Sequence, residues 1–163
     1  LCDFTMGNGH DTEYLCKSAP EGKVYAFDIQ ENALKNTAAR LSAAGLHNAV
    51  LIHDSHANCE KYIREPLDGG MFNLGYLPGN GNKTVHTMRE STLPAVKAAI
   101  GLLKKGGILV ISVYPGHEEG RLEGEMLTER LAAYDKKFYC VTLLRLINSP
   151  DAPFIIAVEK YDK

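Results

Sequence analysis

Two glycines and an acidic residue near the start of the chain have the spacing of a cofactor-binding turn. Asp3 lies four positions before Gly7, and Gly9 follows in the segment Asp3-Phe-Thr-Met-Gly-Asn-Gly-His-Asp-Thr12. The flanking residues predict a buried strand before the turn and a helix after it. Such a junction presents backbone N–H groups to a ligand, and glycine lets the ligand approach the backbone closely. The segment predicts a ligand pocket, although a Gly-Asn-Gly turn is also an ordinary loop.

The position three residues after Gly9 separates two classes of ligand. A dinucleotide fingerprint, Gly-x-Gly-x-x-Gly, would place a third glycine there, but this chain has Thr12. The order Asp-x-x-x-Gly-x-Gly instead resembles motif I of class I S-adenosylmethionine (SAM) methyltransferases. Asp3 and Asp11 could face the cationic amino-acid end of SAM, and Asp3 could instead only brace the turn.

The segments that would position these groups alternate between strand and helix. Apolar runs predict strands, and helix-forming stretches predict helices. The predicted strands cover residues 1–4, 23–27, 48–53, 71–76 and 108–114, and the predicted helices cover residues 11–18, 31–44, 57–63, 87–104 and 118–136. Pro66 and the glycine pair at 69–70 are expected to break the chain, and the pair at 106–107 to lead into the fifth strand. This alternation is typical of a parallel α/β sheet.

Two further apolar runs follow. Residues 138–147 and 154–159 are separated by the polar segment Asn148-Ser-Pro-Asp-Ala-Pro153, which predicts an antiparallel hairpin at a sheet edge. Five strand–helix units and such a hairpin describe the class I SAM-methyltransferase fold. That fold is α/β and Rossmann-like, with a mostly parallel seven-stranded sheet and helices on both faces. A dinucleotide-binding domain would be expected to close with another parallel strand.

Length and composition fit one soluble globular domain over residues 1–163. The chain is 45% hydrophobic and 23% charged, as expected for a single core. No apolar run approaches the roughly 18 residues that span a bilayer, so we expect no membrane association. The four cysteines lack metal-like spacing and favour buried, reduced thiols in the cytoplasm. Because the sequence opens within a predicted strand, we expect that a short N-terminal segment is missing.

Polar side chains follow the predicted strands at the edge where open parallel sheets bind ligands. Asp28 lies 19 residues after Gly9, close to the roughly 20-residue offset at which an acidic side chain meets ribose hydroxyls. Asp54 follows the third strand and suits the adenine amino group. Each aspartate could instead cap the helix that follows it, because aspartate is a favoured N-cap.

Two histidines, His53 and His56, flank Asp54. No third ligand with matching spacing accompanies them, so we expect no zinc or other metal site. Stacking or capping suits both side chains better.

The segment Asn73-Leu-Gly-Tyr76 lies where amino-group methyltransferases carry Asn-Pro-Pro-Tyr. In that motif the Asn side chain and the next backbone carbonyl accept hydrogen bonds from the target nitrogen, and the aromatic ring packs on the target group. Two acceptors would aim the nitrogen lone pair at the methyl carbon for in-line displacement. Leu74 and Gly75 replace both prolines, so the turn is less rigid. Asn73 could instead be a buried strand residue satisfied by backbone, and Tyr76 could belong to the core.

An alkyl amine must lose a proton before it can attack a methyl carbon. From a lysine-like pKa of about 10.4, deprotonation at pH 7 costs roughly 4–5 kcal/mol. His117, in Tyr114-Pro-Gly-His-Glu-Glu-Gly120, follows the fifth predicted strand, and histidine side chains titrate near neutrality. His117 is therefore a candidate base, with capping of the helix at Glu118 as the alternative.

Five segments together resemble one family, the bacterial group labelled putative rRNA methylase. They are Asp3-Phe-Thr-Met-Gly-Asn-Gly-His-Asp-Thr12, Ala26-Phe-Asp-Ile-Gln30, Ile52-His-Asp-Ser-His56, Phe72-Asn-Leu-Gly-Tyr-Leu-Pro-Gly79 and Gly116-His-Glu-Glu-Gly120. The resemblance covers nearly the whole chain and implies a class I SAM domain without a separate RNA-binding domain. It also implies SAM contacts at Asn8, Asp11, Asp28, Gln30, Asp54, Ser55 and His56.

The resemblance further implies an activity on tRNA, with SAM as the cofactor. The implied reaction converts 5-aminomethyl-2-thiouridine at the wobble position, in the anticodon stem-loop, to its methylaminomethyl form. The net charge of −2 argues against a strongly basic nucleic-acid binder, so RNA contacts would come from the core domain, from a homodimer, or from both. Candidate phosphate contacts are Lys83, Arg89 and Arg121, with a solvated surface charge as the alternative for each.

The motif and the resemblance together predict two sets of site residues. The predicted cofactor-binding residues are Asp3, Gly7, Asn8, Gly9, Asp11, Thr12, Asp28, Gln30, Asp54, Ser55 and His56, and the predicted catalytic residues are Asn73, Tyr76 and His117. A methyltransferase for rRNA or for a small amine, and a non-catalytic nucleotide-binding module, are the alternatives. A nicotinamide oxidoreductase is disfavoured by Thr12.

Overall fold

The computed structural model describes residues 1–74 and 89–161 of the chain, which form one sheet flanked by helices. The strands are β1 (Cys2–Asp3), β2 (Val24–Asp28), β3 (Ala49–His53), β4 (Leu67–Leu74), β5 (Leu103–Val113), β6 (Tyr139–Leu144) and β7 (Phe154–Lys160). The helices are α1 (His10–Ser18), α2 (Glu31–Ala43), the 3₁₀ helix η1 (His56–Asn58), α3 (Cys59–Tyr62), α4 (Arg89–Leu102) and α5 (Glu118–Ala132).

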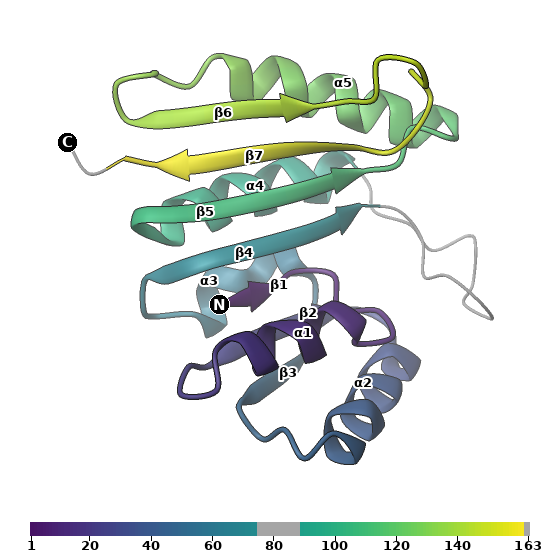
Figure 1. Cartoon of the computed structure of the whole chain (residues 1–163), viewed down its shortest axis with the longest axis vertical. Coiled ribbons are helices and arrows are strands. Elements are labelled where there is room, and N and C mark those ends of the chain that lie inside the picture. Colours follow the sequence, from purple (N-terminus) through teal and green to yellow (C-terminus); the bar gives the residue numbers. More distant parts are fainter. Residues whose placement is uncertain (75–88, 162–163) are drawn as a thin grey trace.

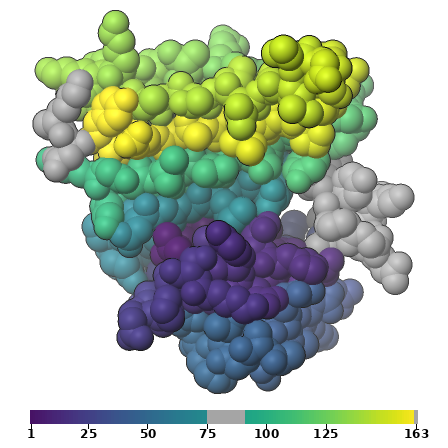
Figure 2. Space-filling model, viewed as in Figure 1, coloured from purple at the N-terminus to yellow at the C-terminus, as the bar shows by residue number. Residues whose placement is uncertain are grey.

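The sheet has seven strands in the order β3-β2-β1-β4-β5-β7-β6. Strands β1 to β5 run parallel, and β7 is antiparallel to both β5 and β6. Helices α1 and α2 contact each other on one face, and α3, α4 and α5 form a layer on the other (Figure 1). Figure 2 shows the N-terminal elements at one end of the molecule and the C-terminal hairpin at the other. The predicted class I SAM-methyltransferase fold is confirmed.

The short strand β1 lies at the point where the strand order reverses. The chain runs outward from β1 through β2 to β3 and then returns to β4 on the other side of β1. Open α/β sheets bind ligands beyond the carboxyl ends of the strands at such a switch point. The fold therefore places the expected site at the ends of β1, β2 and β4.

Three stacked phenylalanine rings support this end of the sheet. The Phe4 ring is stacked on Phe72, with centroids 4.4 Å apart, and on Phe27, with centroids 6.1 Å apart. All three side chains are fully buried, and burial of each contributes roughly 1.5–3 kcal/mol. Because Phe4 directly follows β1, the stack ties the start of the glycine turn to β2 and β4.

The two glycine pairs lie inside strands, so the predicted break at 69–70 is wrong. β4 already begins at Leu67, and Gly69 and Gly70 pair with Ile108 and Leu109 of β5. A Cβ at Gly70 would come 2.7 Å from the Phe4 ring. The glycines are needed there because neighbouring groups approach the backbone closely, a role that a single strand's sequence does not reveal. The pair at 106–107 likewise lies within β5, which starts at Leu103 rather than at residue 108.

Other element ends differ from the prediction at exposed positions. β6 ends at Leu144, short of the predicted end at Ile147, and α5 ends at Ala132 rather than at residue 136. The residues beyond both ends are mostly exposed, so no buried face selects strand or helix there. The predicted helix over residues 57–63 is divided into η1 and α3.

All four cysteines are free; Cys2, Cys16 and Cys59 are buried, and Cys140 is half-buried. Within residues 1–74 and 89–161, no helix combines the length and apolar character needed to cross a bilayer.

Candidate active site

The glycine turn joins β1 to α1 with two residues in the left-handed backbone region. Gly7 has φ 51° and Gly9 has φ 78°, a region that L side chains rarely adopt. The Gly9 N–H donates to the Met6 carbonyl over 2.8 Å, and Gly9 is the N-cap of α1. A Cβ at Gly9 would also come 2.7 Å from Thr37 Oγ1 on α2. Glycine at this position is required both by the backbone conformation and by the packing of α2.

Asp3 and Thr12 lie beneath the turn, where both are fully buried. Asp3 Oδ2 accepts a hydrogen bond from the Thr12 hydroxyl over 2.6 Å, and Oδ1 accepts from the Thr5 N–H over 3.1 Å. Burial raises the pKa of Asp3 to about 6, although the hydrogen bond from Thr12 opposes that shift. In this structure neither side chain reaches a ligand surface, and the pair braces the turn from below. The geometry favours bracing of the turn by Asp3 over a direct contact between Asp3 and SAM.

Asp28 links the end of β2 to the glycine turn. Its Oδ2 accepts from the Gly7 N–H over 3.0 Å, and its Oδ1 accepts from the Gln30 N–H over 2.9 Å. The N-cap of α2 is Gln30, which makes no side-chain capping hydrogen bond, so Asp28 is not the helix cap. Each carboxylate oxygen has a second lone pair, and the two oxygens can still accept from vicinal hydroxyls.

Asp54 is held by its own neighbours at the end of β3. Its Oδ1 accepts from the Ser55 N–H over 2.7 Å and from Asn58 Nδ2 over 2.9 Å, and its Oδ2 accepts from the Tyr62 hydroxyl over 2.8 Å. The hydrogen bonds from Asn58 and Tyr62 lower the pKa of Asp54. Ser55, whose Oγ accepts from the Ala57 N–H, is the N-cap of η1. Asp54 is therefore an ionised carboxylate, and Ser55 rather than Asp54 caps η1.

His56 presents a buried nitrogen acceptor next to the Phe72 ring. Its Nδ1 lies 3.1 Å from the Phe4 carbonyl. Because a carbonyl can only accept, Nδ1 carries the proton. Burial lowers the pKa of His56, so Nε2 is unprotonated, and it is buried without a hydrogen-bond partner among the described residues. The imidazole packs edge-on against Phe72, with centroids 5.5 Å apart. An unpaired buried acceptor fits a ligand that brings its own donor.

The other histidine of this segment, His53, is exposed, and its Nε2 lies 3.0 Å from the Ile29 carbonyl. Among residues 1–74 and 89–161, no group of three or more His, Cys, Asp or Glu side chains could hold a metal ion.

A cavity of about 680 Å³ opens beside the turn. Its lining residues come from the segments after β1 and β5, the first turn of α1, the end of β4 and the β6–β7 loop; they are Thr5, Met6, Gly7, Asn8, His10, Asp11, Asn73, Leu74, Tyr114, Pro115, Gly116, His117, Asp151 and Pro153. The cavity brings together the predicted residues Gly7, Asn8, Asp11, Asn73 and His117. It does not include Asp28, Gln30 or the 54–56 segment, which lie at the ends of β2 and β3.

Asn73 joins the turn to β4 through two short hydrogen bonds. Its backbone N–H donates to Thr5 Oγ1 over 2.6 Å, and its side-chain Nδ2 donates to Asp11 Oδ2 over 2.6 Å. A carboxylate accepts only from the amide NH₂, so Asp11 fixes which way the Asn73 amide points. Asn73 Oδ1 accepts no hydrogen bond within the described residues. The Asn73 side chain therefore pairs with the Asp11 side chain and not with a backbone group.

His117 is the N-cap of α5. Its Nδ1 accepts from the Gly120 N–H over 3.0 Å, so a neutral ring carries its proton on Nε2. In that tautomer Nε2 is a donor rather than a base, and this atom is buried. The structure therefore favours the capping alternative for His117 over proton abstraction.

Several cavity residues were not predicted from the sequence. Tyr114 follows β5, and the strand-end rule that indicated Asp28 and Asp54 could have indicated it. Thr5 and Asp151 had no such signal, because Thr5 acts through Asn73 and Asp151 reaches the cavity from the β6–β7 loop. Tyr76, Lys83 and the side chain of Arg89 lie outside the described residues, and Arg121 pairs with Glu125 over 2.7 Å on α5.

The donor set fits SAM. The cavity volume lies within the roughly 300–1,000 Å³ of small-molecule sites. A carboxylate at Asp11 would suit the cationic amino-acid end of SAM, and one at Asp28 would suit its hydroxyl groups. These two carboxylates lie on either side of the turn, since Asp11 is in the first turn of α1 and Asp28 ends β2.

Known proteins resemble this chain over nearly its whole length. The family model described as "Putative rRNA methylase" matches residues 24–159. The Arabidopsis thaliana protein "tRNA (mnm(5)s(2)U34)-methyltransferase, chloroplastic" is 35% identical over an alignment that covers 98% of this chain and 62% of that protein. The chain thus spans less than two thirds of that relative's length.

Two solved bacterial structures agree closely with the fold. A "putative rRNA-methylase" from Clostridium thermocellum superposes with a TM-score of 0.93 at 38% identity, covering 98% of this chain and 87% of the other. A "putative methyltransferase" from Streptococcus mutans in complex with SAH has a TM-score of 0.87 at 38% identity, with coverage of 98% and 86%. The chain belongs to the rRNA methylase family of class I SAM-dependent methyltransferases.

Proposed function

We propose that this chain is a SAM-dependent N-methyltransferase that converts the 5-aminomethyl group of wobble 2-thiouridine in tRNA to methylaminomethyl. The hydrogen bond from Asn73 Nδ2 to Asp11 Oδ2, at 2.6 Å on the cavity wall, carries the proposal. It leaves the Asn73 carbonyl oxygen as an acceptor beside the glycine turn. An amine nitrogen that donates to this oxygen would lie next to the cofactor.

The chain's own residues would hold the cofactor along the ends of three strands. SAM supplies an electrophilic methyl carbon bonded to a positively charged sulfur. Asp11 would face the amino-acid end, and Asp28 would accept from the ribose hydroxyls. The segment 54–56 would flank the adenine. There His56 Nε2, which has no hydrogen-bond partner among the described residues, would accept from the adenine amino group. A pairing of this kind satisfies a buried polar atom that otherwise destabilises the fold.

On the acceptor side, Asn73 would orient the amine. Its neutral carbonyl oxygen accepts from the amine N–H and leaves the nitrogen lone pair directed at the methyl carbon. Such orientation is a large part of the rate gain in displacement reactions. A neutral acceptor also stabilises the cationic form of the amine less than a carboxylate would.

A carboxylate on the β6–β7 loop completes the acceptor side of the cavity. Asp151 lines the cavity and forms no hydrogen bond or ion pair with the other described residues. We assign it the task of attracting the protonated aminomethyl group into the cavity.

Two comparisons support RNA as the substrate class. The Arabidopsis thaliana relative carries a tRNA wobble-uridine methyltransferase name, and the family description names ribosomal RNA. The first covers nearly the whole chain, and an aminomethyl acceptor suits the Asn73 geometry. The second makes rRNA the alternative acceptor. Residues 1–163 would act as one domain in either case.

Transfer of a labelled methyl group separates these substrates. The protein and methyl-labelled SAM are incubated in parallel reactions, one with tRNA that carries 5-aminomethyl-2-thiouridine and the other with undermodified ribosomal subunits. The proposal predicts label in tRNA and none in ribosomal subunits above the level of an Asn73→Ala control. Label only in ribosomal RNA would contradict the tRNA assignment, and no transfer to any RNA would contradict methyltransferase action on RNA.

A further inference from the structure

Three side chains on one face of α2 hold the glycine turn from outside. Asn36 Nδ2 donates to Asn8 Oδ1 over 3.0 Å, and the Thr37 hydroxyl donates to the Gly7 carbonyl over 3.1 Å. Arg40 Nε donates to the Asn8 carbonyl over 2.9 Å. The turn is therefore attached to α2 through both its backbone and the Asn8 side chain.

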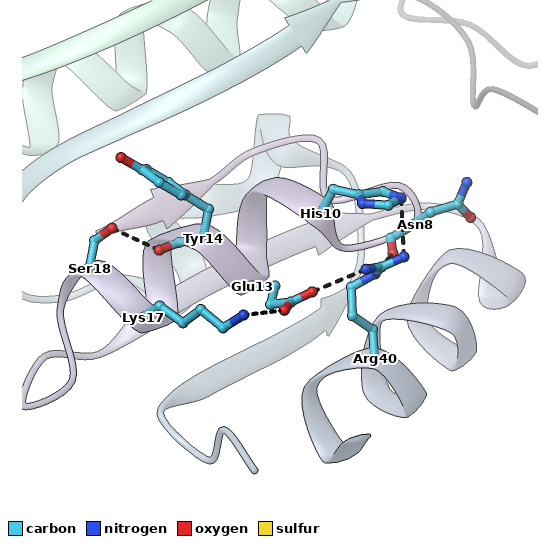
Figure 3. A network of polar contacts seen from close by, with 7 residues as sticks. All are labelled: Asn8, His10, Glu13, Tyr14, Lys17, Ser18 and Arg40. Atoms are coloured by element: carbon cyan, nitrogen blue, oxygen red, sulfur yellow. Dashed lines mark hydrogen bonds and ion pairs between the residues drawn. The ribbon is translucent and has the colours of Figure 1, made fainter. Parts of the chain in front are cut away.

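Arg40 makes the most extensive of these contacts (Figure 3). Besides the Asn8 carbonyl, its Nη1 donates to Glu13 Oε2 over 3.0 Å, and its Nη2 lies 3.1 Å from His10 Nε2. One planar guanidinium thus connects α2 to the turn and to the first turn of α1. Its side chain is 32% exposed, so the contacts are partly shielded from water.

Arg40 lies on the opposite side of the turn from the proposed cofactor. It lines a second cavity, of about 780 Å³, between α1 and α2, and does not line the first. Asn8 and His10 line both cavities and form the wall between them. A change at Arg40 can therefore affect the proposed cofactor site only indirectly, through the glycine turn or the first turn of α1.

We propose that Arg40 is a positioning residue for SAM binding, which acts by fixing the Asn8 carbonyl on the α2 side of the turn. The inference rests on the proposed function, because it takes the turn as the cofactor site. The turn contains two left-handed glycines and would sample other conformations without this anchor. Apparent affinity falls in proportion to the fraction of the protein in the binding-competent conformation. Arg40 keeps that fraction high.

The chain offers a matched control in Lys17. Lys17 Nζ donates to Glu13 Oε1 over 2.6 Å, so it belongs to the same network and carries the same charge. Among the described residues, its hydrogen bond and ion pair are to Glu13 and not to residues 7–9, and Figure 3 shows it on the side of Glu13 away from Asn8. Lys17→Ala removes a cation from the network without removing an anchor of the turn.

The test measures SAM affinity by calorimetry and steady-state kinetics on tRNA for Arg40→Lys, Arg40→Ala and Lys17→Ala. Arg40→Lys keeps the charge and the aliphatic stem but loses the planar set of donors. We expect both Arg40 variants to raise the Kd and the KM for SAM about tenfold, the weight of one charge-assisted hydrogen bond. At saturating SAM, kcat should change less than about twofold. Lys17→Ala should leave all three values unchanged.

Hydrogen exchange of the peptide covering residues 5–12 distinguishes local loosening of the glycine turn from destabilisation of the whole fold. In the Arg40 variants without SAM, exchange in this peptide should increase while that of β4 and β5 stays the same, and saturating SAM should restore protection. Unchanged SAM affinity in Arg40→Lys with increased exchange throughout the chain would assign Arg40 a structural role only. A wild-type protein that fails to bind SAM would instead overturn the proposed function itself.

Discussion

Asn73 and Asp11, 62 positions apart in the sequence, meet through a hydrogen bond of 2.6 Å from Asn73 Nδ2 to Asp11 Oδ2. This contact links the end of β4 to the first turn of α1 across the cavity wall. It orients the Asn73 amide, which is the group proposed to accept the substrate amine. Asp11 therefore has two tasks, one toward the cofactor and one toward Asn73.

A double-mutant cycle tests this relationship. Asn73→Ala should lower kcat about a hundredfold, because a misplaced acceptor costs orientation of the nucleophile, and should change the Kd for SAM little. Asp11→Ala should lower kcat and also weaken SAM binding. The double variant should have the kcat of Asn73→Ala alone, since Asp11 influences turnover through Asn73.

The cycle requires single-turnover rates at saturating SAM together with calorimetric Kd values. If the two losses in rate multiplied in the double variant, Asp11 would not act through Asn73. If Asn73→Ala weakened SAM binding as much as it slowed turnover, amine positioning would be the wrong role for Asn73.

Asp28→Ala should weaken SAM binding about tenfold or more, the loss of a hydrogen bond to a charged group. Part of this effect would come from the Gly7 N–H, which loses its acceptor. Asp68→Ala is the matched control, because Asp68 pairs with Lys104 near the opposite end of β4. Calorimetry should show an unchanged Kd for the control, and an unchanged Kd for Asp28→Ala would remove the ribose role.

Asp151→Asn should raise the KM for tRNA several-fold and lower kcat, because the substrate amine loses a counter-charge that borders the cavity. The Kd for SAM should not change. Asp135→Asn alters charge equally at the start of the C-terminal hairpin, where Asp135 caps the Lys137 N–H. Steady-state kinetics that gave the same KM for both variants would point to a general charge effect on RNA binding.

Asp3 should make the stability of the fold depend on pH. Its pKa is about 6 in the folded chain and about 3.9 in an unfolded chain. Between these values the unfolded state has released the proton that the folded state retains, so stability falls as pH rises. The loss over this window is about 3 kcal/mol, at 1.36 kcal/mol for each pKa unit.

Other carboxylates titrate in the same range, so the effect is measured as a difference. Denaturant unfolding of the wild type and of Asp3→Asn should give a stability difference that moves in favour of the variant as pH rises from about 4 to 7. The asparagine oxygen still accepts from Thr12. A difference that is constant with pH would show that Asp3 titrates normally.

Local patterns in the sequence were sufficient to predict the strand–helix alternation, the C-terminal hairpin and the glycine turn. Each depends on residues close together in the chain, as Gly7 and Gly9 do with α1. The glycine pair at 69–70 depends instead on distant neighbours, because the Phe4 ring just after β1 leaves no room for a Cβ at Gly70 and the Ile108 carbonyl on β5 approaches Gly69.

In the site, too, local patterns were predictable and contacts between distant residues were not. The strand-end rule placed Asp28 and Asp54 correctly at the ends of β2 and β3. It could not show that Asp3 is buried under Thr12, that His117 accepts from the Gly120 N–H, or that Asp11 orients Asn73. Those are contacts of individual atoms in the folded chain, and two of the three join residues on different elements.

The most direct test of the account is the identity of the nucleoside that receives the methyl group. Undermodified tRNA is incubated with the protein and methyl-labelled SAM, digested to nucleosides, and analysed by mass spectrometry. We predict that 5-aminomethyl-2-thiouridine is lost and that 5-methylaminomethyl-2-thiouridine appears with the label on the exocyclic nitrogen, and that Asn73→Ala forms almost none. Label on a ring carbon, on a ribose oxygen or on any other nucleoside would contradict an amine methyltransferase acting at the wobble position.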